Sequence, residues 1–332
     1  MKIARQCHLT AIVTGVILST TFLGLCMAEE PVMQVTRDLY TGQIVITEGD
    51  VPVLKYNYQL VCPPKGLVAS VAQGNRKYAR ARSNYIHPLY GPSGEELTYD
   101  WSRDHPHHRG IYWAWPEVDW HGERGDLHAL QRVYARPTGN VSFETTGTFG
   151  KIVAENRWFW EDETPIVREV TTICAHQAND QGRFIDLTYS FEALEDDVAL
   201  ARRGTNAYGG LNIRMSPIKN MKLIHHADPV SASPQRAWSD SIGTREGGTE
   251  SVGFAVLEKI TNPDYPGDWA EYPDLPWFQP TFPAQGTRYV LKKGTPLVLR
   301  YRLWIRKAKE TSEAQYAEQW RLYNNTSKER TQ

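Results

Sequence analysis

Residues 104–110 hold the densest group of chemically active side chains in this sequence. One aspartate, three histidines and one arginine fall there: Asp104, His105, His107, His108 and Arg109. Histidine can take up or release a proton near neutral pH, and its neutral ring nitrogens bind metal ions. The arginine stays charged and can hold a carboxylate through two parallel hydrogen bonds. The segment therefore predicts a functional site.

Proton transfer is the first chemistry that these residues allow. A histidine would act as general base or acid, positioned by Asp104, while an arginine would stabilise negative charge as it develops. Removing the proton beside a uronic-acid carboxylate gives β-elimination, and protonating a glycosidic oxygen gives hydrolysis. Both reactions stay open at this point. The residues predicted to be catalytic are His87, His107, His108 and Arg109.

Metal binding is a second alternative. If the strand expected after Arg109 began at His105, then His105 and His107 would point to one side and His108 to the other. Two imidazoles on one side could share a divalent metal with a third ligand from elsewhere. Pro106 makes this alternation irregular. We therefore expect no required cofactor and keep a divalent metal as an alternative, together with a buried structural network that does no chemistry.

Tryptophan gives the second signal, because several of the chain's 11 tryptophans interleave with the histidine segment or follow Asn262. Flat aromatic faces stack on the C–H faces of sugars, although core packing explains a single tryptophan equally well. The predicted partner is thus a carbohydrate. The residues expected to bind it are Arg82, Asp104, His105, Trp113, Trp115, Arg214, Asn262, Trp269 and Trp277. The histidines without comparable neighbours are expected to be structural: His121, His128, His176, His225 and His226.

The first 28 residues predict an export signal. Lys2 and Arg5 give a positive start, an apolar stretch follows, and Ala28 offers a small residue at the cleavage point. No later segment reaches the roughly 20 apolar residues that a membrane helix needs. We expect an exported protein, periplasmic or extracellular, with no membrane span.

Charge and cysteine content narrow the possible partners. The formal net charge is −1 at pH 7 with histidine neutral, whereas a nucleic-acid-binding protein would need a basic surface. After removal of the signal, Cys62 and Cys174 remain, and they could form a disulfide or stay as thiols. The sequence predicts no nucleic-acid partner and leaves the oligomeric state open.

Alternation of apolar and polar residues dominates the chain and predicts β-strands. Ranges 43–47 and 51–58 read as a hairpin, as do 289–291 and 297–306, and ranges 141–149, 153–160, 166–174 and 184–193 continue the pattern. Ser312 can cap a helix over about 312–323. The predicted fold is all-β: one large antiparallel β-sandwich, supersandwich-like, over 29–332, with a short C-terminal helix.

Several motifs together resemble one bacterial family. They are residues 84–90 (Asn-Tyr-Ile-His-Pro-Leu-Tyr), 104–110 (Asp-His-Pro-His-His-Arg-Gly), 209–214 (Gly-Gly-Leu-Asn-Ile-Arg), Trp238, and Asn262-Pro263 before a Trp-rich loop. Over roughly residues 55–308 the chain resembles the PmoA-like family of unknown function. That label refers to a methane oxygenase subunit with several membrane spans, and the lack of an apolar span argues against that activity here. The resemblance implies a setting among secreted proteins that act on polysaccharides.

These observations together predict an exported carbohydrate-active enzyme. It would be a polysaccharide lyase or a glycoside-cleaving hydrolase that uses a His/Arg cluster for proton transfer and anion stabilisation. The alternatives are a glycan-binding protein without catalysis and a His-ligated metalloenzyme.

Overall fold

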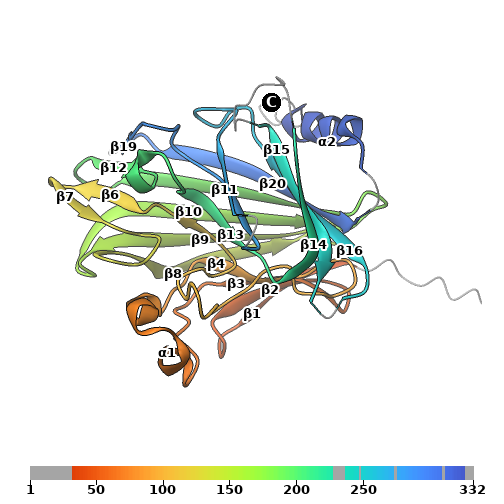
Figure 1. Ribbon diagram of the computed structural model, residues 1–332, viewed down its shortest axis with the longest axis horizontal. Helices are drawn as coiled ribbons and strands as arrows, with labels where there is room; N and C mark the ends of the chain where they lie inside the picture. Colours follow the sequence, from red (N-terminus) through yellow and green to blue (C-terminus); the bar gives the residue numbers. More distant parts are fainter. Residues whose placement is uncertain (1–31, 227–235, 247, 273–274, 309–310, 326–332) are drawn as a thin grey trace, which may run out of the picture. The chain divides into compact units, whose positions relative to one another are not determined.

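Antiparallel strands make up most of the computed structural model, which describes residues 32–226, 236–246, 248–272, 275–308 and 311–325 (Figure 1). In β9 (Phe149–Trp160) and β11 (Arg183–Ala193), buried and more exposed side chains alternate. This is the pattern of a strand with one face in a core, because successive side chains point to opposite faces. The predicted all-β class is confirmed.

The first eight-stranded sheet contains the amino-terminal strands, and all its neighbours pair antiparallel. In spatial order its strands are β1 (Met33–Asp38), β2 (Gln43–Glu48), β3 (Val51–Asn57), β4 (Tyr85–Leu89), β5 (Ile111–Ala114), β13 (Gly210–Arg214), β18 (Trp277–Pro280) and β17 (Trp269–Tyr272). The predicted hairpin of β2 and β3 is confirmed by their pairing.

A second sheet of eight strands and a smaller sheet of four complete the strand topology. The second sheet runs β14 (Ile218–His225), β15 (Trp238–Arg245), β16 (Ser251–Glu258), β20 (Leu297–Lys307), β11, β10 (Thr164–His176), β9 and β8 (Val133–Thr145). The small sheet runs β19 (Tyr289–Leu291), β12 (Val198–Ala201), β6 (Glu117–Trp120) and β7 (Glu123–Gly125).

The core lies where the two large sheets face each other. Trp113 of β5, in the first sheet, has its ring 5.4 Å from Tyr189, 5.3 Å from Phe191 and 6.1 Å from Tyr301, all in the second sheet. Trp115 follows the same strand and packs 5.0 Å from Phe191. The structure is therefore the predicted antiparallel sandwich.

The hairpin expected from β19 and β20 is wrong. β19 pairs with β12 in the small sheet, whereas β20 pairs with β11 and β16 in the large one. Only an isolated bridge between Lys292 and Thr295 joins the two segments. The predicted turn is present as this bridge, but the strands on either side of it pair with other strands.

The C-terminal helix α2 (Glu313–Asn325) covers the outer face of the second sheet at one end. Ser312 and Gln315 hydrogen-bond reciprocally, since Ser312 N donates to Gln315 Oε1 (2.8 Å) and Gln315 N donates to Ser312 Oγ (3.3 Å). This capping box satisfies donors that a helix start leaves free. Tyr316 of the helix packs against Trp238 and Trp304. The predicted helix is confirmed, about two residues longer at its end.

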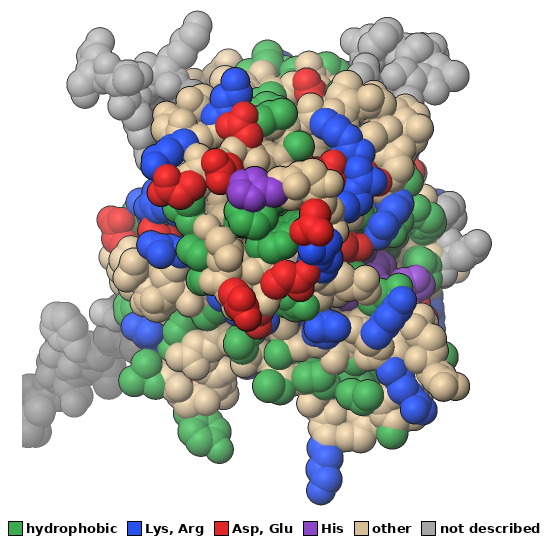
Figure 2. Space-filling view, turned by 90° about the vertical axis from the view of Figure 1, so that its left-hand side faces the viewer, with side chains coloured by type: hydrophobic (Ala, Val, Ile, Leu, Met, Phe, Trp, Pro, Cys, Tyr) green, Lys and Arg blue, Asp and Glu red, His purple; other side chains and the backbone are tan. Residues whose placement is uncertain are grey.

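Residues Pro31–Gln332 belong to one compact unit, and the predicted signal peptide at 1–28 lies outside the described residues. Within the part of the chain that the structure describes, no helix is long and apolar enough to cross a membrane. Cys62 and Cys174 are both free thiols. On the face that Figure 2 shows, acidic and basic side chains are interspersed, which does not favour binding of a polyanion there.

Candidate histidine pocket

The histidine segment forms a tight turn rather than the start of a strand. His108 N donates to His105 O (2.9 Å), and β5 begins only at Ile111. Pro106 occupies the second position of this turn, where its fixed φ is favourable. The alternation expected from a strand is therefore wrong. Instead of pointing to opposite sides, the His107 and His108 rings lie 4.6 Å apart.

A second loop, after β7, adds His128 to the two histidines of the turn. Asp126 and Gln131 close this loop through a pair of backbone hydrogen bonds of 2.7 and 2.8 Å. His128 N donates to Trp115 O (3.3 Å), which anchors the loop just beyond the end of β5. The ring of His128 thus lies 4.8 Å from His107 and 5.1 Å from His108.

His107, His108 and His128, here called the histidine trio, each direct a ring nitrogen to one place. The nitrogens lie within 4.8 Å of one another. Burial lowers the pKa of His107 to about 3 and lowers the pKa of His108 and of His128 well below the ordinary value. All three are therefore uncharged at neutral pH. A neutral imidazole offers a lone pair to a proton or to a metal ion.

The trio lies in a cavity of about 390 Å³ that has aromatic walls. These walls are formed by Tyr78, Tyr208, Tyr272 and Trp277. Tyr272 and Trp277 stack with their centroids 4.5 Å apart and their planes at 14°. The size is in the range of small-molecule sites, which combine apolar walls with a few polar groups.

Two charged residues line the same cavity. Arg203 donates to Asp126 Oδ2 (2.6 Å), and its Nε donates to the Tyr208 hydroxyl (3.4 Å). Burial raises the pKa of Asp126, although the Arg203 guanidinium acts in the opposite direction. Of the described residues that line the cavity, Asp126 is the only carboxylate. The cavity thus combines one ion pair with four histidines, since His105 lines it as well.

His105 differs from the trio because it has a carboxylate partner. Its Nδ1 lies 3.0 Å from Asp104 Oδ2, and its side chain is 41% exposed. Asp104 in turn accepts a hydrogen bond from Arg214 (3.2 Å). Burial acts to raise the pKa of Asp104, but hydrogen bonds from His105 and Ser102 and the Arg214 guanidinium hold it well below its usual range. This chain of contacts orients the His105 ring.

Arg109 and His87 were predicted to be catalytic, and the structure places both outside the lining of this cavity. Arg109 is fully buried, where it pairs with Asp100 and stacks on Trp101 with its guanidinium carbon 3.4 Å from the ring centre. His87 Nδ1 lies 3.1 Å from Thr98 Oγ1, and burial lowers its pKa to about 4. Their geometry is that of packing and ion pairing.

Four of the residues expected to bind substrate have structural contacts instead. Trp113 and Trp115 are buried between the sheets and offer no face to a ligand, which corrects the stacking role expected of them. Trp269 is buried and donates to Arg236 O (3.1 Å). Asn262 exchanges two hydrogen bonds with the backbone of Arg300. Of the predicted tryptophans, only Trp277 lines the cavity.

Arg82 supports the loop that carries His128. Its Nη2 donates to Leu127 O (3.0 Å) and His128 O (2.5 Å), and its guanidinium carbon lies 4.3 Å from the centre of the Tyr112 ring. The Tyr112 hydroxyl is 3.1 Å from His128 Nδ1. Arg82 thus supports the backbone of the loop that carries His128 and does not line the cavity.

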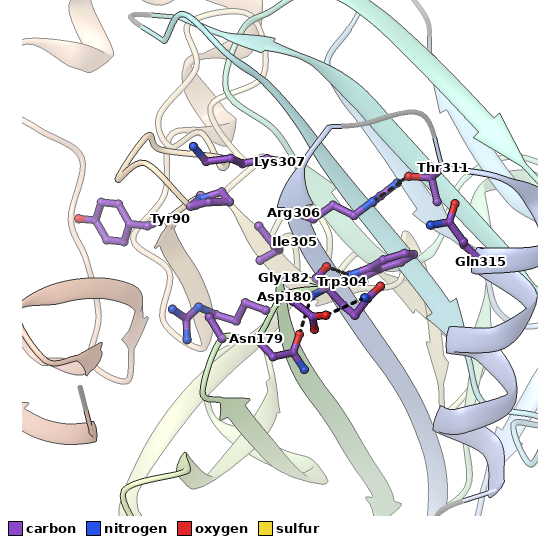
Figure 3. A pocket seen from close by; sticks show the side chains of 15 residues that line it. Tyr90, Asn179, Asp180, Gly182, Trp304, Ile305, Arg306, Lys307, Thr311 and Gln315 are labelled. Atoms are coloured by element: carbon purple, nitrogen blue, oxygen red, sulfur yellow. Dashed lines mark hydrogen bonds between the residues drawn. The ribbon is translucent and has the colours of Figure 1, made fainter. Parts of the chain in front are cut away.

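A larger cavity, of about 500 Å³, lies away from the histidines (Figure 3). It is bounded by the turn between β10 and β11, the end of β20 and the start of α2. Its cations have partners: Arg183 pairs with Glu48, Arg306 with Asp240, and Lys307 with Glu250. This cavity is larger than the histidine pocket, but the concentration of titratable groups favours the histidine pocket as the functional site.

Sequence reasoning missed His128, Asp126, Arg203, Tyr208 and Tyr272. His128 was expected to be structural because it has no titratable cluster around it in sequence, and its partners arrive only through folding. The single local signal was the run Asp126 to Gln131, where Asp126 Oδ1 accepts from Ala129 N (2.8 Å) to stabilise the turn.

Comparison with known proteins identifies the family. The model of a family of unknown function, DUF6807, matches residues 43–321. The chain belongs to this family. The match includes every residue of the histidine pocket, and the function of the family is unknown. No curated protein matches the chain significantly.

Three solved structures show a weak likeness to the chain, and all are carbohydrate-active proteins by name. A putative kojibiose phosphorylase from human microbiome has 10% identity and a TM-score of 0.32, over 65% of this chain and 26% of its own. A polysaccharide lyase has 11% identity and a TM-score of 0.33, over 85% and 33%. The GH36 α-galactosidase AgaB from Geobacillus stearothermophilus has 9% identity and a TM-score of 0.37, over 84% and 41%. The chain thus spans less than half the length of each, and at these scores the likeness carries no argument about function.

Proposed function

We propose that this protein is a carbohydrate-active enzyme that works in the histidine pocket and cleaves a uronic-acid-containing glycan by β-elimination. The observation that carries the proposal is the stacked pair Tyr272 and Trp277 in the same cavity as four histidines. An aromatic platform suits the C–H face of a sugar ring, and the histidines supply groups that accept a proton.

The carboxylates favour elimination over a conventional hydrolysis. Most glycoside hydrolases need two carboxylates on either side of the scissile bond. Among the described residues that line the cavity, only Asp126 is a carboxylate, and it is engaged by Arg203. Elimination instead needs a base and a positive charge near the sugar's own carboxylate.

His105 is the proton acceptor in this proposal, and Asp104 is its positioning residue. His105 removes the proton from the carbon beside the uronate carboxylate. The electron pair of that C–H bond forms a carbon–carbon double bond while the bond to the leaving glycosidic oxygen breaks. The leaving oxygen takes up a proton, which the Tyr208 hydroxyl on the same cavity wall can supply. Arg203, which donates to Tyr208, lies beside this step.

The test is incubation of the purified protein with a panel of uronate-containing and neutral polysaccharides. We expect ultraviolet absorbance from a new double bond conjugated to the carboxylate, in the uronate group alone. His105→Ala should lower the rate by about 10²–10⁴-fold. His121→Ala is the matched control, because His121 is exposed and pairs with Asp196 away from the cavity.

Three outcomes would contradict the proposal. New reducing ends without a double bond would show hydrolysis. Binding without any change in the ligand would show a glycan-binding protein. An unchanged rate in His105→Ala would remove the proposed proton acceptor.

A further inference from the structure

Hydrogen bonding leaves two ring nitrogens of the histidine trio unexplained. Among the described residues, neither Nδ1 of His107 nor Nδ1 of His108 has a hydrogen-bond partner, and His108 is only 3% exposed. Buried polar atoms without a partner cost free energy, so proteins usually supply one. Because both nitrogens belong to rings that converge with His128, one missing ligand could satisfy them together.

We propose that His107, His108 and His128 bind one divalent transition-metal ion, with zinc the best fit. Three imidazoles and a water form a common catalytic zinc set. At metal–nitrogen distances of about 2.0–2.1 Å, tetrahedral ligands lie about 3.4 Å apart. The trio nitrogens lie within 4.8 Å of one another, so small ring rotations suffice.

The surroundings of the trio hold the rings in place. The Tyr112 hydroxyl, 3.1 Å from His128 Nδ1, fixes that ring and leaves its Nε2 for the ion. The His105 ring stacks on His108 at 4.8 Å and 25°. The Trp277 ring also packs against His108, with the two ring centroids 5.2 Å apart. Contacts of this kind around a metal ligand raise affinity because they fix the ring orientation.

The charges around the site decide which ions fit. Arg203 and Arg214 would repel a cation, but Asp126 and Asp104 pair with them. Uncharged nitrogen ligands suit zinc and its transition-metal neighbours, whereas calcium and magnesium prefer oxygen ligands. The site therefore selects a transition metal.

The metal site deepens the proposed function, on which its catalytic role rests. An ion with an open position toward the cavity would bind the substrate carboxylate and neutralise the charge that develops when His105 removes the proton. Metal binding itself requires only the trio. The two proposals can therefore be tested separately.

The experiment is a titration of the chelator-treated protein with Co²⁺, whose visible absorption reports tetrahedral nitrogen coordination, and with Zn²⁺ by calorimetry. We expect one equivalent of each metal. His108→Ala and His128→Ala should weaken binding at least about 100-fold, and Tyr112→Phe about 10-fold. His121→Ala should bind as the natural chain does. His128→Cys keeps a ligand and should retain binding, which separates ligand loss from misfolding.

The inference is overturned if the folded protein binds no stoichiometric Co²⁺ or Zn²⁺, or if His108→Ala binds as tightly as the natural chain. Metal binding without glycan cleavage would support this inference and contradict the proposed function. Glycan cleavage at an undiminished rate by protein that binds no metal would contradict this inference and support the proposed function.

Discussion

At the residue scale, the pocket contains two kinds of histidine. In the trio, His108 and His128 are buried and His107 is half-buried, and among the described residues two of the trio's nitrogens lack a hydrogen-bond partner. His105 is partly exposed and has Asp104 as a partner. In the two proposals, the same kind of side chain therefore serves metal coordination in one position and proton transfer in the other. The difference comes from the partner of each ring and from its access to the cavity.

Glu258 gives a prediction at this scale, because burial raises its pKa to about 7. In the unfolded chain the carboxyl titrates near 4.5, so between about 4.5 and 7 the folded state holds a proton that the unfolded state releases. Stability should fall as the pH rises through this window. Glu258→Gln keeps an acceptor for Gly267 N but cannot ionise.

Above pH 7 this variant should therefore be more stable than the natural chain by roughly 1–3 kcal/mol. Near pH 4.5 the two should be equal. Urea denaturation at both pH values measures the difference, with the exposed Glu318→Gln as control. An equal difference at both pH values would contradict the prediction.

At the element scale, the four histidines of the pocket lie in connections between strands, whereas Tyr272 and Trp277 lie on β17 and β18. The connection between β4 and β5 carries His105, His107 and His108, and the one after β7 carries His128. The short 3₁₀ helix η1 (Gln73–Tyr78) supports the first connection, since Asn75 Nδ2 donates to Asp104 O (2.9 Å). Rigid sheets position these loops, which is how binding sites are commonly arranged.

Gly110 lies between the histidine turn and β5 and gives the prediction at this scale. Its φ is +60°, and a Cβ there would lie 2.2 Å from Ile86 O in the neighbouring strand β4. Gly110→Ala should therefore lower the free energy of unfolding by more than about 2 kcal/mol and displace the turn. Thermal unfolding measures the first effect and Co²⁺ affinity the second.

Gly94→Ala is the matched control. Its φ is +84°, but no atom lies within 4 Å of the added Cβ. Gly94→Ala should lower the free energy of unfolding by about 1 kcal/mol, from backbone strain alone. Equal losses of unfolding free energy in Gly110→Ala and Gly94→Ala would show that the contact of the added Cβ with β4 does not destabilise the fold.

At the scale of the whole molecule, the aromatic residues divide between core and pocket. Trp113 and Trp115 join the two large sheets, whereas Tyr272 and Trp277 form a wall of the cavity. Sequence spacing does not separate the two groups, because both lie on strands of the first sheet or beside them. Their depth in the sandwich decides their role.

Trp113→Ala tests this division. It should lower the free energy of unfolding by about 3–5 kcal/mol, because the cavity left between the sheets cannot collapse fully. Trp120→Ala, at a less buried position of the small sheet, should lower the free energy of unfolding by a smaller amount. Denaturant unfolding monitored by circular dichroism compares them. A smaller loss for Trp113 than for Trp120 would contradict its place in the core.

The sequence by itself determined the fold class and the C-terminal helix, and it placed His105, His107 and His108, which line the pocket, in one short segment. These depend on local patterns: alternating apolar residues, a capping serine, and histidines adjacent in the chain. Only the tertiary structure decided which other residues line the pocket together with the histidines of this segment. His128 lies in the loop after β7, and Arg203 lies in the short 3₁₀ helix η2 (Arg203–Thr205). Trp113 is part of the core, and β19 pairs with β12 and not with β20. Such placements depend on long-range packing, which adjacent residues do not encode.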